Sequence, residues 1–297
     1  MCIICETSDI SSLVNLTQLD CSECSLLTSI PDTLVNLNVL YCDNCSLLTS
    51  IPDTLVNLTK LYCDNCPLLI NIPNTLVNLT YLDCDDCHLL IDIPLTLVNL
   101  EYLDCSNCHL LTVVPDSLFN LQYLRCYSCP LLTNIPSTLV KLIVLDCKYC
   151  PLLPSIPDTL VNLITLFCNN CTLLTTIPSG FNLLTYLDCD DCPLLTSIPD
   201  TLLNLTTLWC GNCRSLTSIP STLVNLTKLS CYNCPWIYID KTENIQKLIS
   251  LQHFVKRNLK YRRFSRWIKS KSGVEWIYHP DNIGGKMAKR EIEKMFT

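Results

Sequence analysis

The sequence predicts an α/β-type solenoid with one short parallel strand per coil, and three observations carry this prediction. Cysteines recur every 21 residues from Cys21 to Cys231, and a second cysteine follows each by three residues. Leucines stand at fixed distances around these pairs, and a proline occurs near the same point of most copies. One short unit cannot bury its apolar side chains alone, so stacked copies are expected to share one core, with roughly ten positions per coil facing inward.

We number the repeat from position 1, which is Leu16 in the first full copy and Leu226 in the eleventh. The consensus is L-x-x-L-x-C-x-x-C-x-L-L-T-x-I-P-x-T-L-V-N. Positions 3 to 7 alternate variable and apolar residues, which is typical of a half-buried strand. The proline at position 16 excludes a long helix, so the return segments are predicted to be irregular or short-helical. Cys2 and Cys5 belong to a shortened first copy, two residues short of the period.

This consensus resembles the leucine-rich repeat, L-x-x-L-x-L-x-x-N/C-x-L, with cysteine at the sixth and ninth positions. The resemblance covers roughly residues 1–238 and implies a leucine-rich repeat horseshoe, in which outward strand residues line a concave binding face. The near-identical copies, the abundant Cys and Asn, and the stretch 278–286 (YHPDNIGGK) also resemble the expanded repeat families of giant DNA viruses that infect amoebae.

Charge divides the chain into two regions. Residues 1–234 hold 21 acidic and 6 basic residues and all 24 cysteines, whereas residues 235–297 hold 6 acidic and 14 basic residues. We therefore predict a solenoid over 1–239 and a basic, mainly helical C-terminal cap over 240–297. Apolar residues at helical spacing between 245 and 259 suit such a cap.

The basic side of this tail admits a second function. It could bind nucleic acid, an anionic membrane surface or an acidic protein, although it contains no recognisable nucleic-acid motif. The viral resemblance implies a substrate adapter whose tail docks a second protein such as a ubiquitin-ligase subunit, although 240–297 shows no F-box pattern. The candidate docking residues are Arg262, Arg263, Arg266 and Trp267.

The cysteine pairs allow three interpretations. Two C-x2-C pairs with 17 residues between them match the spacing of four-cysteine zinc sites, and disulfides are a second alternative. We favour buried free thiols, because positions 6 and 9 lie among core leucines and cysteine packs as a small hydrophobe. We predict no metal and no cofactor. The even cysteine count and the absence of a signal-peptide pattern indicate a reducing, cytoplasm-like compartment, that of a host cell if the protein is viral. No apolar run is long enough for a membrane span.

Positions 3, 5, 7 and 8 vary most, and stacking turns them into rows of Tyr beside rows of Asp. Exposed aromatics supply binding anchors, and the acidic rows favour a protein or peptide with a basic surface over nucleic acid. We expect a monomer. The predicted partner-binding residues are Tyr41, Tyr62, Tyr81, Asp83, Asp85, Tyr102, Asp104, Tyr123, Arg125, Phe167, Tyr186, Asp188 and Trp209.

An enzymatic alternative depends on Asp83 and Asp104, which are expected side by side with His88 and His109 nearby. Paired carboxylates and histidines are suited to acid–base or metal chemistry. Stacking alone explains their proximity, however, and the inward-facing cysteines leave no obvious nucleophile. The sequence therefore predicts a non-enzymatic protein-interaction module with no catalytic residues.

Overall fold

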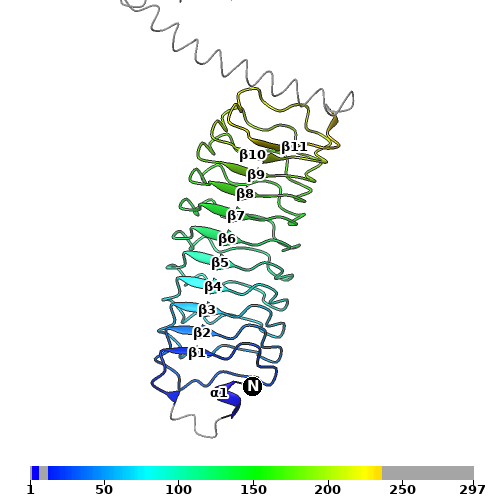
Figure 1. Ribbon diagram of the computed structural model, residues 1–297. Coiled ribbons are helices and arrows are strands. Elements are labelled where there is room, and N and C mark those ends of the chain that lie inside the picture. Colours follow the sequence, from blue (N-terminus) through cyan, green and yellow to red (C-terminus); the bar gives the residue numbers. More distant parts are fainter. Residues whose placement is uncertain (1, 7–12, 236–297) are drawn as a thin grey trace, which may run out of the picture. The chain divides into compact units, whose positions relative to one another are not determined.

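The computed structural model describes residues 2–6 and 13–235. Eleven strands form one parallel sheet in sequence order, stacked along one side of the coils (Figure 1). This arrangement confirms the parallel-strand solenoid. The helix is α1 (Ile3–Glu6), and the strands are β1 (Gln18–Asp20), β2 (Val39–Tyr41), β3 (Lys60–Tyr62), β4 (Tyr81–Asp83), β5 (Tyr102–Asp104), β6 (Tyr123–Arg125), β7 (Val144–Asp146), β8 (Thr165–Phe167), β9 (Tyr186–Asp188), β10 (Thr207–Trp209) and β11 (Lys228–Ser230).

The predicted cap over 240–297, with the candidate docking residues Arg262, Arg263, Arg266 and Trp267, lies outside the described residues. Within the part of the chain that the structure describes, no helix is both long and apolar enough to cross a bilayer.

Every strand occupies positions 3 to 5 of the repeat and pairs with its neighbours without a register shift. Between β4 and β5, for example, Leu82 pairs with Leu103 and Asp83 pairs with Asp104. Each position of the repeat therefore becomes a row that runs along the solenoid. The return segments are irregular and consist of turns, as the proline at position 16 predicts.

Seven positions of the repeat are buried in the interior copies, namely 1, 4, 6, 9, 12, 15 and 19. This is fewer than the sequence suggests, and the leucines at position 11 account for part of the difference. Leu90 at position 12 is fully buried, whereas the adjacent Leu89 at position 11 is 40% exposed. Neighbouring residues in the turn after the strand point in different directions, so only one of the two reaches the core. The exposed residues, here called the leucine row, are Leu26, Leu47, Leu68, Leu89, Leu110, Leu131, Leu152, Leu173 and Leu194.

Burial of the cysteines is confirmed, since every cysteine except Cys5 is buried and all are free thiols. The position-9 thiol donates a hydrogen bond to the position-6 carbonyl of the preceding coil, as from Cys87 Sγ to Cys63 O at 3.1 Å. The position-6 thiol donates to the position-5 carbonyl of the following coil, as from Cys63 Sγ to Asp83 O at 3.2 Å. The hydrogen bond with Cys87, together with burial, raises the pKa of the Cys63 thiol well above its ordinary value. The pKa values of Cys42 and Cys84, at the same position of neighbouring coils, are raised in the same way, so these position-6 thiols stay neutral.

Two further side-chain rows join neighbouring coils. The position-21 asparagine donates to the position-20 carbonyl of the preceding coil, as from Asn78 Nδ2 to Val56 O at 2.9 Å. The position-18 hydroxyl donates to the position-17 carbonyl, as from Thr75 Oγ1 to Asp53 O at 2.7 Å. Backbone carbonyls in the return segments, which have no strand partner, thus accept hydrogen bonds from these side chains. The repeated Asn and Thr of the consensus serve this purpose.

Position 8 adopts a left-handed backbone in all eleven copies, with φ between 51° and 61°. Asn and Asp tolerate this region better than other non-glycine residues, and eight of the eleven copies have one of them. The sequence analysis placed position 8 among the variable residues of the binding face. The left-handed backbone is a second reason why Asn and Asp are common at this position.

Leu89 and Leu90, the adjacent leucines of the fourth full copy, provide a test of which position enters the core. Leu90→Ala is expected to lower the free energy of unfolding by about 2 to 5 kcal/mol, because it opens a cavity in the core. Leu89→Ala is expected to change it by less than about 0.5 kcal/mol, because its side chain is largely solvated. Urea unfolding followed by circular dichroism measures both. Equal destabilisation by the two substitutions would contradict the burial pattern.

Candidate interaction surface

The outward side chains at positions 3, 5 and 7 form one surface, here called the strand face. Its main feature is the tyrosine stack, defined as Tyr41, Tyr62, Tyr81, Tyr102 and Tyr123. Neighbouring ring centroids are 4.6, 4.6, 4.3 and 6.2 Å apart along this series. The stack changes from position 5 to position 3 between β3 and β4. Five predicted binding residues therefore form one aromatic ridge across β2 to β6.

The first four tyrosines of the stack are half-buried, and Tyr123 is 42% exposed. The rings of Tyr81 and Tyr102 are almost parallel, with an interplanar angle of 3°. Stacked rings hold one another in place, so a partner that binds them orders few new side-chain torsions. Such preorganisation suits the stack to anchoring a ligand.

A second aromatic group lies farther along the strand face and joins three other predicted residues. Phe167 and Tyr186 have ring centroids 4.9 Å apart, and Tyr186 and Trp209 have centroids 6.4 Å apart. Trp209 is 42% exposed. This group covers β8 to β10 and is separated from the tyrosine stack by β7, whose position-3 residue is Val144.

Beside the tyrosine stack lies the carboxylate row, defined as Asp43, Asp64, Asp83 and Asp85. Burial and the contact with Asp64 raise the pKa of Asp43 to about 7. Burial and the charge of Asp104 raise the pKa of Asp83 to about 7, and the same two causes raise the pKa of Asp85. Over residues 13–235, the ion pairs involve only Asp104 and Asp146, so no Lys or Arg side chain pairs with this row.

Asp104 and Asp188 serve the fold itself. Asp104 is 5% exposed and accepts hydrogen bonds from the backbone N–H and the hydroxyl of Ser106, at 3.1 and 2.6 Å. Its other oxygen lies 3.6 Å from Arg125. Asp188 likewise accepts the backbone N–H of Asp190 at 3.2 Å. These two carboxylates hold the turn at the end of their strands, which leaves less of them for a partner.

Sequence reasoning missed two features of this surface. Lys148 pairs with Asp146 at 3.2 Å and lies over the ring of Tyr127, 4.7 Å from its centroid. The leucine row was the second omission. The doubled leucine at positions 11 and 12 was a signal for it, because one member of each pair had to point away from a core that the other filled.

The residues of the enzymatic alternative are only partly brought together. Asp83 and Asp104 face each other in register, as expected. His88 and His109 stack on each other with centroids 4.7 Å apart, and His88 Nδ1 lies 3.1 Å from the carbonyl oxygen of Asn107. Among residues 2–6 and 13–235, no three of these Asp and His side chains approach closely enough to hold a metal ion.

The Leucine Rich Repeat family model matches residues 15–37, 36–58, 99–121 and 183–205. These segments are leucine-rich repeats. The leucine-rich repeat domain of the type III effector XopL is similar in structure, with a TM-score of 0.57 and 22% identity, over 71% of this chain and 79% of that one. The leucine-rich effector protein YopM from Yersinia pestis has a TM-score of 0.58 and 20% identity, over 74% of this chain and 62% of its own, less than two thirds of its length.

The fold is therefore that of leucine-rich repeat proteins, which typically act as binding scaffolds. No curated protein matches the chain in sequence. The comparisons thus show the repeat segments and the fold, and the evidence on function lies in the strand face.

The raised pKa values predict how stability depends on pH. In the unfolded chain an Asp carboxyl titrates near about pH 3.9, whereas Asp43 and Asp83 titrate at about 7 in the folded protein. The folded state binds more protons than the unfolded state between these pH values. The stability that the two carboxyls contribute is therefore fully present below about pH 4 and is lost as the pH rises through about 7. The melting temperature should therefore fall between about pH 4 and pH 7, and Asp83→Asn should make this fall smaller. Thermal unfolding at a series of pH values measures both. An unchanged pH profile would show that Asp83 titrates normally.

Proposed function

We propose that the protein binds a basic segment of a partner protein on the strand face over β2 to β6. The observation that carries this proposal is the tyrosine stack beside a carboxylate row that no Lys or Arg side chain of the described solenoid pairs with. Aromatic anchors and complementary charge are the features that make a surface a binding site.

The carboxylate row favours a cationic partner over a neutral one. Stacked coils place the carboxyl of Asp64 beside that of Asp43, and the carboxyl of Asp104 beside that of Asp83. Together with burial, these neighbours disfavour ionisation of Asp43 and of Asp83. A Lys or Arg side chain placed between them would stabilise the ionised forms. Binding should therefore release protons near neutral pH and weaken as salt concentration rises.

Arg125 and Lys148 limit the site on its C-terminal side. They pair with Asp104 and Asp146 on β5 and β7, so the acidic character of the strand face decreases there. A basic segment would therefore follow the stack from Tyr41 to Tyr102 and meet two cations beyond it. This charge pattern gives the partner a preferred register.

Peptide arrays test the site directly. Lys/Arg-rich peptides that contain an aliphatic residue should bind the full chain, and Tyr81→Ala with Tyr102→Ala should weaken binding at least about 10-fold, because it removes the centre of the stack. Tyr149→Asn is the matched control, since Tyr149 is exposed outside the stack and its left-handed backbone accepts Asn. Fluorescence anisotropy measures the affinities. Equal affinity of all three proteins, or a preference for acidic peptides, would refute the proposal.

The adapter function remains a second candidate, favoured by the change from an acidic, cysteine-rich region to a basic, cysteine-free tail after residue 234. In this alternative the strand face holds one protein and the tail holds another. Reversal of charge at Arg262, Arg263 and Arg266 in the full chain should abolish capture of one partner and leave peptide binding by the strand face unchanged. Affinity capture with quantitative mass spectrometry, comparing the two proteins, measures this. An identical set of captured proteins would exclude docking through these residues.

A further inference from the structure

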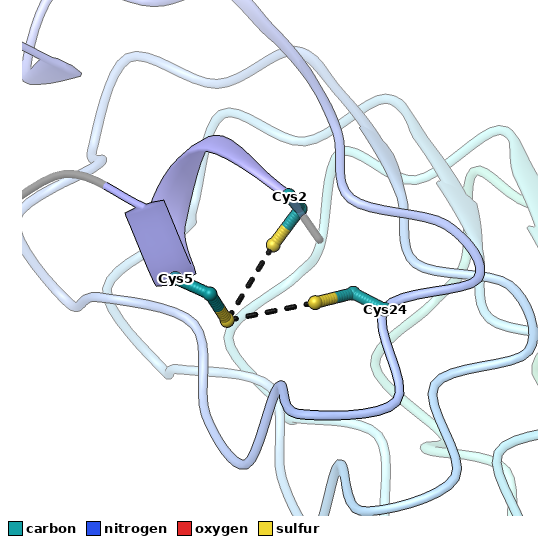
Figure 2. A group of neighbouring side chains, drawn as sticks. All are labelled: Cys2, Cys5 and Cys24. Carbon is teal, nitrogen blue, oxygen red and sulfur yellow. Dashed lines mark hydrogen bonds between the residues drawn. The ribbon is translucent and has the colours of Figure 1, made fainter.

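Three cysteines converge at the N-terminal end of the solenoid. Cys2 Sγ lies 3.8 Å from Cys5 Sγ, which lies 3.5 Å from Cys24 Sγ, and all three sulfur atoms fall within 4.8 Å of one another. Figure 2 shows Cys2 and Cys5 at α1 and Cys24 on the facing loop, with their side chains directed toward a common centre.

This convergence is a departure from the cysteine pattern of the other coils. There, a position-9 thiol donates to a backbone carbonyl of the coil before it, as from Cys45 Sγ to Cys21 O at 3.2 Å. No other group of three Cys, His, Asp or Glu side chains comes this close in the described segments 2–6 and 13–235. Cys5 brings the third thiol to this group, because its sulfur lies close to those of both Cys2 and Cys24.

The cause is the local backbone of the shortened first copy. The N–H groups of Cys5 and Glu6 donate to the Cys2 carbonyl at 2.9 and 3.2 Å and close one helical turn. Residues three apart in such a turn share a face, so the Cys2 and Cys5 side chains point the same way. Cys24 reaches them from the turn after β1.

The geometry suits a thiophilic metal ion. In a tetrahedral zinc site with Zn–S bonds of about 2.3 Å, neighbouring sulfur atoms lie about 3.8 Å apart. The Cys2–Cys5 and Cys5–Cys24 sulfur distances are close to this separation, and C-x2-C is a common spacing for two of the ligands. Thiolates are soft ligands that select zinc over the harder magnesium and calcium ions.

Burial also suits a metal site. Cys2 and Cys24 are 8% and 1% exposed, whereas Cys5 is half-buried, so the group is sheltered and still open to solvent on one side. Three thiolates fill three of the four tetrahedral positions, and the half-buried side of Cys5 leaves the fourth accessible to a further ligand. An ion would join α1 to the first full coil, and a solenoid needs its terminal coil secured.

We propose that Cys2, Cys5 and Cys24 bind one Zn²⁺ ion that fastens the N-terminal end of the solenoid. Each thiol loses its proton to solvent when its sulfur binds the ion, so three protons are released for one Zn²⁺ taken up, with no change of oxidation state. The site is a structural one and is separate from the strand face.

Metal titration of the reduced, chelator-treated full chain tests this proposal. One Zn²⁺ per chain is expected by native mass spectrometry, and the Co²⁺ form should show thiolate-to-metal charge-transfer absorption. Cys5→Ser should abolish stoichiometric binding and the charge-transfer band. Cys45→Ser is the matched control: it changes a position-9 thiol of the next coil outside the trio and should retain one Zn²⁺.

Two further measurements keep the result independent of folding. Zn²⁺ should raise the melting temperature of the original chain and leave that of Cys5→Ser unchanged. It should also protect Cys5, the one cysteine that is not buried, from alkylation. Absence of a bound ion in the original chain, unaltered binding by Cys5→Ser, or equal loss of binding in Cys45→Ser would each overturn the proposal.

Discussion

Each coil of this protein depends on its neighbours for the hydrogen bonds of its backbone. Strand N–H groups donate to the carbonyls of the adjacent coil, and side chains at positions 9, 18 and 21 supply donors to carbonyls that no strand pairs with. A buried carbonyl without a donor costs about 1 to 3 kcal/mol, so an insertion or deletion within a coil would be costly. This requirement explains why the period of 21 is held through eleven copies and why Cys, Thr and Asn recur with the leucines.

The same stacking determines the chemistry of the surface. Parallel strands lie about 4.8 Å apart, so a side chain repeated in consecutive coils meets its own copies at that spacing. For tyrosines this produces favourable ring stacking. For Asp43 and Asp83 it adds carboxylate repulsion to burial, and the two together raise the pKa of each to about 7. A binding face made of both has rigid aromatic side chains and carboxylates that repel one another without a paired cation. A basic ligand would pack on the aromatic rings and pair with the carboxylates.

The described structure departs from the regular repeat at the N-terminal end of the solenoid. At the N-terminal end, α1 replaces the regular turn, and its cysteines gather instead of following the ladder of the interior. A one-turn helix gains little stability by itself, so it needs a tertiary contact to hold it against the first coil. A metal ion bound by three thiolates would provide such a contact.

Sequence alone determined the period, the strand positions, the burial of the cysteines and the rows of Tyr and Asp. It could do so because each coil is adjacent to its own copy, so that spacing along the chain corresponds directly to position in space. Only the tertiary structure decided which of Leu89 and Leu90 enters the core, that the tyrosine stack passes from position 5 to position 3, and that Asp104 is held by Ser106. It also decided that Cys5 meets Cys2 and Cys24. These features depend on side-chain direction and on turns outside the strands, where the repeat pattern gives the order of residues and leaves their orientation to packing.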